Sequence, residues 1–256
     1  MDKEEFIKEV SNLGIEVSLD QLEKLDRYYD LLVEWNKKIN LTAIVEKKKV
    51  YLKHFYDSLT LVKVIDLNKE NTFLDVGTGA GFPGIVIKIF FPHLKVTLLD
   101  SIGKRIVFLK KVINELKLDN ILCVCERAEV YACSHRNCYD VVTARAVSSI
   151  NILLELCLPM VKKDKYFLAM RGKEEYNYTN ALNILGGKVI LNENFLLPYE
   201  KSERNIIKIK KENNISIKYP RKFSEIKKRP LWNINYIIID VFFIFFDFFV
   251  EIFSKK

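Results

Sequence analysis

An acidic residue and a set of three alternate glycines stand together in the stretch Leu74-Asp-Val-Gly-Thr-Gly-Ala-Gly-Phe-Pro-Gly84, which ends on a fourth glycine. The glycines, at positions 77, 79 and 81, let the backbone turn tightly and let a ligand approach without interference from Cβ atoms. Apolar residues before this stretch predict a short buried strand, and those after it predict a buried helix. A strand, a glycine turn and a helix N-terminus together form a nucleotide-type site at the carboxyl edge of a parallel sheet.

Three polar residues follow the next predicted strands. Asp100 ends the second strand, where its carboxylate can accept hydrogen bonds from both hydroxyls of a ribose. Glu129 follows the third strand and could reach an adenine amino group, and Arg145 follows the fourth, where a plain salt bridge is the alternative. Strand ends face one crevice in such sheets, so these residues predict a ligand site. Because Gly79-x-Gly81-x-x-Gly84 also fits a dinucleotide, the glycines alone do not choose between adenosylmethionine and NAD.

The elements that position these residues alternate from about residue 71 onward. Strands are predicted at 72–76, 95–99, 121–125, 139–143, 166–170, 188–194 and 205–210. Helices are predicted at 84–91, 103–117, 149–161 and 173–185. This alternation predicts an α/β fold with an open parallel sheet and helices on both faces.

The first seventy residues are predicted to be helical. Ser18 and Gln21 have the spacing of a capping box, and a further helix is predicted from about residue 46 to 65. His54 and Asp57 lie within one turn of that helix. They are either an acid–base pair or a hydrogen-bonded pair that supports the fold, and we favour the second.

Three regions follow from this pattern. We expect residues 1–70 to be an extension packed on a sheet domain at 71–231, followed by an apolar tail at 232–256. The tail holds seven of the seventeen Phe residues, but its longest uncharged run has nine residues, about half of a membrane span. Its three acids share one helical face, which suits a helix on an apolar surface or a membrane interface. We favour a dispensable extension over membrane contact.

The composition argues against a disordered chain, a disulfide-bonded protein, a metal-binding protein and a secreted one. A hydrophobic fraction of 49% is ample for a core, and the net charge of +8 fits a polyanionic partner without requiring one. The five cysteines form no CxxC pair, which predicts a reduced, cytoplasmic protein without a metal site. The acidic N-terminus does not resemble a signal peptide.

Several motifs in fixed order resemble the bacterial small-subunit ribosomal RNA guanine-N7 methyltransferases, also called glucose-inhibited division protein B. The resemblance covers roughly residues 5 to 231. The motifs are Asn40-Leu-Thr-Ala-Ile44, His54-x-x-Asp-Ser58, the glycine stretch, Leu99-Asp-Ser-x-x-Lys-Arg105, Arg127-Ala-Glu129, Arg145-Ala146, Tyr219-Pro-Arg-Lys222 and Lys228-Arg-Pro-Leu231.

The resemblance implies a Rossmann-like class I methyltransferase that binds adenosylmethionine and has a seven-stranded, mostly parallel sheet with an antiparallel last strand. The cofactor contacts that it implies are Gly77, Gly79, Phe82, Ala128, Glu129 and Arg145. Asp100 is added to them because its carboxylate can accept hydrogen bonds from the ribose hydroxyls. The chain departs from the family in two places: Lys163-Asp-Lys165 replaces a Gly-Gly turn, and Arg171-Gly172 replaces Lys-Gly. Arginine keeps the charge of lysine but not its shape.

The implied reaction requires no general base, because guanine N7 carries a lone pair and loses no proton. We therefore name no catalytic residue, and expect catalysis by proximity and orientation. The partner would be ribosomal RNA or the small subunit, bound by a monomer. Basic residues expected at the RNA are Lys104, Arg105, Arg171, Arg221, Lys222, Lys227, Lys228 and Arg229. The alternative for the basic run between Arg204 and Arg229 is a solvated face.

Two other functions remain open from the residues alone. An NAD(P)-dependent oxidoreductase would use the same glycine turn, but no hydride-transfer constellation follows Arg145. A non-enzymatic RNA-binding protein would keep only the fold, and the intact glycines and strand-end acids argue against it.

Overall fold

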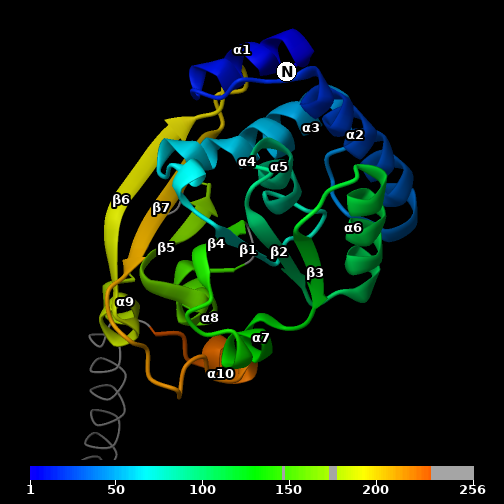
Figure 1. Ribbon diagram of the computed structural model, residues 1–256. Coiled ribbons are helices and arrows are strands. Elements are labelled where there is room, and N and C mark those ends of the chain that lie inside the picture. Colours follow the sequence, from blue (N-terminus) through cyan, green and yellow to red (C-terminus); the bar gives the residue numbers. More distant parts are fainter. Residues whose placement is uncertain (146–147, 173–177, 232–256) are drawn as a thin grey trace, which may run out of the picture.

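A seven-stranded sheet runs through the middle of the computed structural model, which describes residues 1–145, 148–172 and 178–231 (Figure 1). The strand order is β3-β2-β1-β4-β5-β7-β6, and β7 runs antiparallel to both of its neighbours. The strands are β1 (Thr72–Val76), β2 (Lys95–Asp100), β3 (Ile121–Cys125), β4 (Tyr139–Arg145), β5 (Val161–Arg171), β6 (Gly187–Leu196) and β7 (Glu203–Lys211). This topology confirms the predicted α/β methyltransferase fold.

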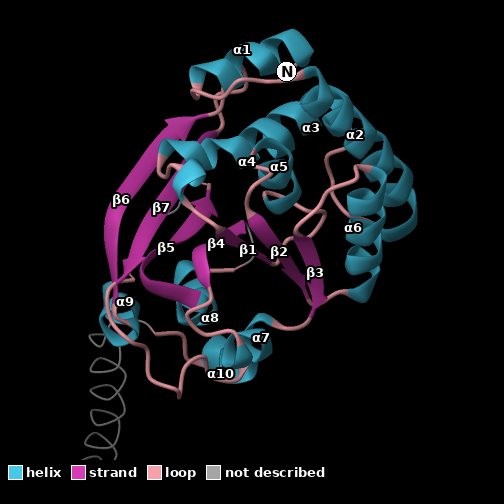
Figure 2. Ribbon diagram, viewed as in Figure 1, coloured by secondary structure: helices cyan, strands magenta, loops and turns pink. Residues whose placement is uncertain are grey.

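Helices cover both faces of the sheet (Figure 2). One face carries α1 (Lys3–Asn12), α2 (Leu19–Ile39), α3 (Lys47–Val50), α4 (Asp57–Leu59), α5 (Gly84–Phe90) and α6 (Gly103–Glu115). The other carries α7 (Ala128–Ser134), α8 (Ile150–Cys157), α9 (Thr179–Leu185) and α10 (Phe223–Lys228). Each face has its own hydrophobic core, and adjacent residues of one strand divide between them: Phe73 packs in the first and Leu74 in the second. The central strands β1, β2 and β4 are buried on both sides, which explains their largely apolar sequence.

The N-terminal helices share a core with the sheet. Helix α2 begins at the predicted capping box, in which the Ser18 hydroxyl accepts from Gln21 N and the Gln21 amide oxygen accepts from Ser18 N. Leu25, Tyr28 and Leu32 of α2 are fully buried in the same cluster as Phe73. The extension therefore forms one wall of the core.

The segment 46–65, which was predicted to form one helix, is not a single regular helix. It is divided into α3, a π-helical stretch at Tyr51–Tyr56, α4 and a 3-10 turn at Thr60–Lys63. Side-chain hydroxyls contribute to this, because Ser58 Oγ donates to the His54 carbonyl at 2.5 Å and Thr60 Oγ1 to the Asp57 carbonyl at 2.6 Å. Such local bonds compete with the regular helical ladder.

The replacement of the Gly-Gly turn has a structural explanation. Asp164 has a φ of 62°, a left-handed conformation that glycine adopts freely and that aspartate tolerates better than most residues. The pairing of β4 with β5 shifts register here and resumes at Val141 and Tyr166. Asp164 also forms a 2.8 Å ion pair with Lys210 of β7. Residues 163–165 thus lie within β5 at an irregularity of its pairing with β4, where Asp164 supplies the left-handed conformation.

Two predictions fall partly or wholly outside the described residues. The helix predicted at 173–185 is seen only as α9, since residues 173–177 are not described, and the tail lies beyond residue 231. The short helices α7 and α10 were not predicted, whereas α1 lies in the N-terminal region that was predicted to be helical. Within the described ranges, no helix combines the length and apolar character that a membrane span requires.

Candidate active site

A cleft of about 1100 Å³ opens at the carboxyl ends of the central strands. Its lining includes all seven residues predicted to contact the cofactor: Gly77, Gly79, Phe82, Asp100, Ala128, Glu129 and Arg145. They come from the loops after β1, β2 and β3 and from the end of β4. The structure therefore brings together residues that are widely separated in the sequence.

The glycine loop needs its glycines for two different reasons. Gly77, Gly79 and Gly81 have φ values of 69°, 61° and 100°, which side chains rarely adopt. A Cβ on Gly81 would lie 2.6 Å from both Ile85 Cδ1 and Tyr28 Oη, whereas one on Gly79 would have no neighbour closer than 3.9 Å. Gly81 is therefore required for packing, and Gly79 leaves open space beside the backbone.

A buried tyrosine fixes this loop from the N-terminal extension. The Tyr28 hydroxyl donates to the Ala80 carbonyl, and the ring stacks on Phe82 at 5.2 Å between centroids. Because Tyr28 is fully buried, the loop is tied to α2 by both a hydrogen bond and ring packing. No sign of this role is visible in the sequence, since the hydrogen bond joins residues that are 52 positions apart.

Asp75 holds the two ends of the glycine loop together. Its Oδ2 accepts from Thr78 Oγ1 at 2.7 Å and from Gly84 N at 2.8 Å, at the start of α5. Its Oδ1 is buried and has no hydrogen-bond partner within the described part of the chain. Burial raises the pKa of Asp75 to about 6. This acid supports the loop from beneath rather than lining the cleft.

The Asp100 carboxylate is oriented by backbone amides and forms an ion pair with an arginine. Oδ2 accepts from Gly79 N at 3.0 Å and from Arg105 Nη1 at 3.1 Å, and Oδ1 accepts from Ile102 N at 2.9 Å. A carboxylate can accept about four hydrogen bonds, and three are already made here. One acceptor site is therefore left, whereas the two hydroxyls of a ribose would need two. Arg105, expected at the RNA, is instead paired with this acid, and its side chain is 34% exposed.

Arg105→Gln is therefore expected to increase adenosylmethionine affinity severalfold, up to about tenfold, because it removes a competitor from Asp100. Calorimetric titration of the folded variant measures the change. Lys104→Gln, an exposed neighbour on α6, should leave the affinity unaltered. Weaker cofactor binding in Arg105→Gln would mean that Arg105 supports the site instead of competing for it.

The first turn of α7 presents Ala128 and Glu129 to the cleft. Glu129 Oε1 accepts from Arg127 Nε at 2.5 Å, and the Arg127 guanidinium lies over the Phe223 ring at 4.9 Å. Phe223 begins α10 and also lines the cleft. The C-terminal segment is thus connected to the cleft edge through Arg127.

His54 and Asp57 are not bonded to each other in the described structure; both contact Arg145. Arg145 Nη1 lies 3.2 Å from Asp57 Oδ2, and Nη2 lies 3.4 Å from His54 Nδ1. The His54 ring stacks on Phe82 at 4.5 Å, and its Nε2 contacts Thr42 Oγ1 at 3.0 Å. Burial, followed by the positive charge of Arg145, lowers the pKa of His54 to about 3. A neutral, stacked imidazole favours the supporting role over acid–base chemistry.

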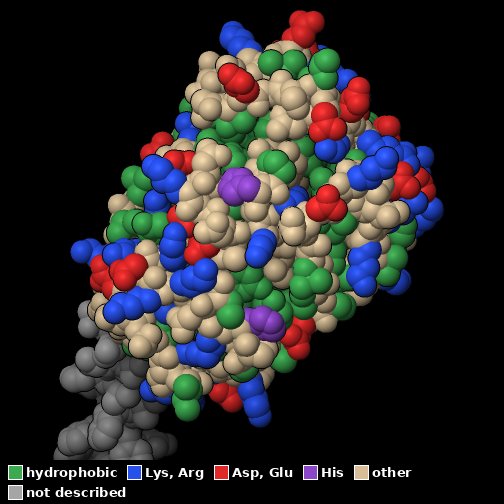
Figure 3. Space-filling model, viewed as in Figure 1, with side chains coloured by type: hydrophobic (Ala, Val, Ile, Leu, Met, Phe, Trp, Pro, Cys, Tyr) green, Lys and Arg blue, Asp and Glu red, His purple; other side chains and the backbone are tan. Residues whose placement is uncertain are grey.

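The predicted basic run is divided by the fold. Lys208, Lys210, Lys211 and Arg221 all have internal partners, and burial lowers the pKa of Lys211 to about 8. Arg221 forms a bidentate pair with the buried Glu155, and Arg171 donates to the Ser148 carbonyl. Both side chains therefore have partners within the fold, and Arg171 also lines the cleft. Figure 3 shows Lys and Arg interspersed with Asp and Glu on the face in view.

The remaining basic residues stay exposed. Lys104 is on α6, and four others are on or beside α10: Lys222, Lys227, Lys228 and Arg229. Since Phe223 lines the cleft, the α10 group lies near its mouth. This part of the run, together with the exposed Lys218, keeps the character of a basic surface.

The cleft has the parts that a nucleoside with an amino-acid chain needs. It offers open space beside Gly79, a fixed acid at Asp100, a second acid at Glu129 and the aromatic ring of Phe82. With the reversed last strand of the sheet, these features define an adenosylmethionine-dependent methyltransferase of the Rossmann-like class.

The chain belongs to the GidB family, rRNA small subunit methyltransferase G, whose model matches residues 21–207. It is 49% identical over 237 residues to the proteins named ribosomal RNA small subunit methyltransferase G of Bacillus licheniformis and Bacillus subtilis, covering 90% of this chain and 99% of each relative. The protein of that name in Staphylococcus saprophyticus is 48% identical over 229 residues, covering 88% and 96%.

Solved structures extend the likeness of fold. The crystal structure of a mutant of MtNAS superposes with a TM-score of 0.52 at 13% identity, covering 76% of this chain and 75% of that one. At this identity the likeness concerns the fold alone. The family membership decides for adenosylmethionine and against the NAD(P)-dependent and non-enzymatic alternatives.

Proposed function

We propose that this chain transfers a methyl group from adenosylmethionine to N7 of a guanine in small-subunit ribosomal RNA. The observation that carries the proposal is the 49% identity to named ribosomal RNA small subunit methyltransferases over 90% of the chain. The cleft supports it, because its lining suits the cofactor and its mouth lies beside the exposed basic residues near α10.

Seven residues would hold the cofactor. Asp100 would accept from the ribose hydroxyls, and Glu129 beside Ala128 would face the adenine. Gly77 and Gly79 would let the amino-acid chain approach the backbone, with Phe82 and Arg145 closing that side. When bound, adenosylmethionine supplies an electrophilic methyl group on a sulfonium.

The residues of this chain would contribute to catalysis by positioning the guanine against the methyl group. Guanine N7 has an in-plane lone pair and gives up no proton on methylation, so no side chain needs to remove one. The neutral state of His54 agrees with this, since an imidazole with a pKa of about 3 is a very weak base. The catalytic contribution that we propose is in-line orientation of the base within the cleft.

The direct test is transfer of labelled methyl from adenosylmethionine to protein-free small-subunit rRNA and to assembled small subunits. Nucleoside digestion and mass spectrometry then identify the product. N7-methylguanosine is the expected nucleoside. Another methylated nucleoside would contradict the proposed base, and transfer to neither substrate would contradict the proposed function.

Exposed charge on α10 provides a test of RNA binding. Replacing Lys227, Lys228 and Arg229 with alanine is expected to weaken rRNA binding and to lower its salt slope by about 0.7 to 0.9 per lost phosphate contact. Binding measured across a salt series gives the slope. Cofactor affinity serves as the internal control and should not change. An unaltered slope would identify these residues as a solvated face.

A further inference from the structure

A buried carboxylate joins two arginine side chains on the wall of the cleft. Arg145 Nη1 lies 3.2 Å from Asp57 Oδ2, and Arg204 Nε lies 3.0 Å from Asp57 Oδ1. The two arginines come from different strands, β4 and β7, while Asp57, which is 4% exposed, comes from the N-terminal extension. We refer to these three residues as the Asp57 site. All three line the cleft.

The Asp57 site has one positive charge more than it can neutralise internally. One carboxylate faces two guanidinium groups, whose side chains are 17% and 22% exposed. The neighbouring His54 is neutral, and Lys53, which also lines the cleft, is paired with Glu200 at 2.5 Å. An anion is therefore the complementary ligand for this wall.

Arg204 has donors left for such an anion. Its Nε donates to Asp57 and its Nη1 to the Glu203 carbonyl at 2.9 Å. Its Nη2 has no hydrogen-bond partner among the described residues. A guanidinium fixed on one edge by a carboxylate presents its other nitrogens in a rigid fork, which matches the oxygens of a phosphate.

The position of Arg204 separates it from the cofactor half of the cleft. Because β7 is antiparallel, its first residues lie at the edge where the parallel strands end, and Asn205 pairs with Arg171 at the end of β5. The backbone of Arg204 is therefore two strands beyond β4, about 10 Å across the sheet, and its side chain reaches back to share Asp57 with Arg145. The glycine loop follows β1, on the opposite side of β4.

We propose that Arg204, held by Asp57, binds a phosphodiester of the nucleotide that is methylated. The inference rests on the proposed function and identifies where its RNA enters the cleft. A base that leaves its stack to reach the cleft brings its own phosphate with it. The carboxylate of adenosylmethionine would be the other anion available. In the proposed function its amino-acid chain would lie beside Gly77 and Gly79, on the other side of β4, and this favours the phosphate for Arg204.

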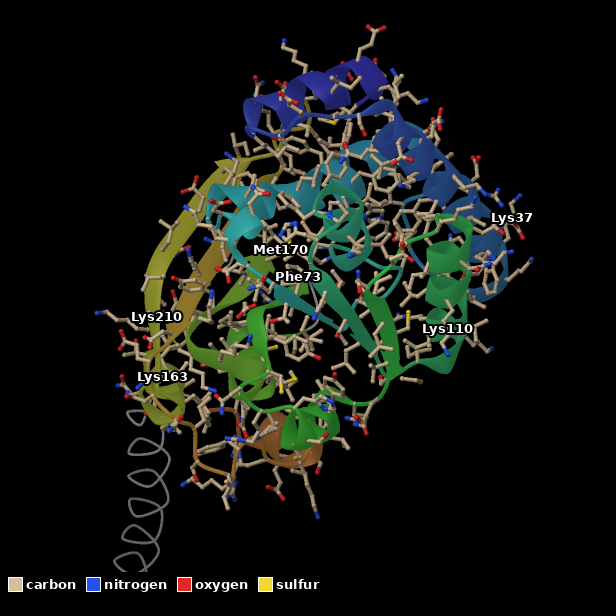
Figure 4. The ribbon with its side chains drawn as sticks, viewed as in Figure 1. Lys37, Phe73, Lys110, Lys163, Met170 and Lys210 are labelled. Carbon is tan, nitrogen blue, oxygen red and sulfur yellow. The ribbon has the colours of Figure 1, made fainter. Side chains whose placement is uncertain are left out.

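The test compares Arg204→Gln with a matched variant on the same strand. Arg204→Gln should weaken binding of protein-free small-subunit rRNA about tenfold or more and lower the salt slope by about 0.7 to 0.9. Its adenosylmethionine affinity should remain within about twofold of the unmodified protein. The matched variant is Lys210→Gln, at the other end of β7 (Figure 4). It removes the same charge about 20 Å along the strand from Arg204 and should change neither quantity.

A second variant protects the test against misfolding. Arg204→Lys keeps the charge but loses the fork, so the salt slope should be retained while part of the affinity is lost. A fall in adenosylmethionine affinity with an unchanged salt slope would assign the site to the cofactor carboxylate and overturn the proposal. Unchanged RNA and cofactor binding in folded Arg204→Gln would reduce the site to a structural ion pair. Both results differ from failure of the proposed function, in which the unmodified protein transfers no methyl group to rRNA.

Discussion

Replacing Asp100 with alanine is expected to weaken adenosylmethionine binding about ten- to a hundredfold, because charge-assisted hydrogen bonds contribute about 1.5–3 kcal/mol. The carboxylate is buried and held by the amides of Gly79 and Ile102. Its loss removes the ribose acceptor and also releases the glycine loop from β2. Calorimetric titration of the folded variant measures the affinity.

Asp140→Ala is the matched control for this prediction. Asp140 is equally buried and lies at the other end of the sheet, where it accepts from Thr72 and pairs with Lys162 at 2.9 Å. Its removal should lower stability while leaving cofactor affinity in the folded protein unchanged. If Asp100→Ala binds adenosylmethionine as tightly as this control, Asp100 does not belong to the site.

Glu155→Ala is expected to lower the free energy of unfolding by about 3 kcal/mol, near the lower end of the range for breaking a buried ion pair. Glu155 is fully buried on α8 and accepts from Arg221 N at 2.9 Å, Nε at 2.8 Å and Nη2 at 2.6 Å. Without it, a guanidinium that is only 23% exposed loses its counter-charge. Urea unfolding should show a lower midpoint with an unchanged slope.

Two comparisons make this stability prediction specific. Glu225→Ala removes an exposed acid from α10 and should change stability by no more than about 0.5 kcal/mol. Replacing Glu155 and Arg221 together with leucine should recover much of the loss, because no unpaired charge then remains. A loss below about 1 kcal/mol in Glu155→Ala would show that Arg221 finds another partner.

The parts of the site that could be predicted from the sequence are those encoded locally. The glycine loop follows β1, Asp100 ends β2 and Glu129 lies at the start of α7 just after β3, and the apolar pattern locates those strands within a few residues. Parallel topology then brings the strand ends to one edge without further information. These residues consequently line one cleft as expected.

The contacts that escaped prediction join residues far apart in the chain. Asp57 and Arg204 are 147 positions apart, and Glu155 and Arg221 are 66 apart. A run of basic residues therefore looks uniform in the sequence while the fold pairs some members and exposes others. Helices of six or seven residues, such as α7 and α10, also carry too few turns to show a clear period.

The order of the last two strands has a consequence for synthesis of the chain. Strand β6 precedes β7 in the sequence, yet β7 lies between it and β5, and β6 pairs only with β7 in the described sheet. A nascent chain that has just released β6 thus has no partner edge for it. Both strands must join the sheet after β7 emerges, so the wall that carries Arg204 cannot form until translation has passed residue 211. Phe223 of α10, which also lines the cleft, is added later still.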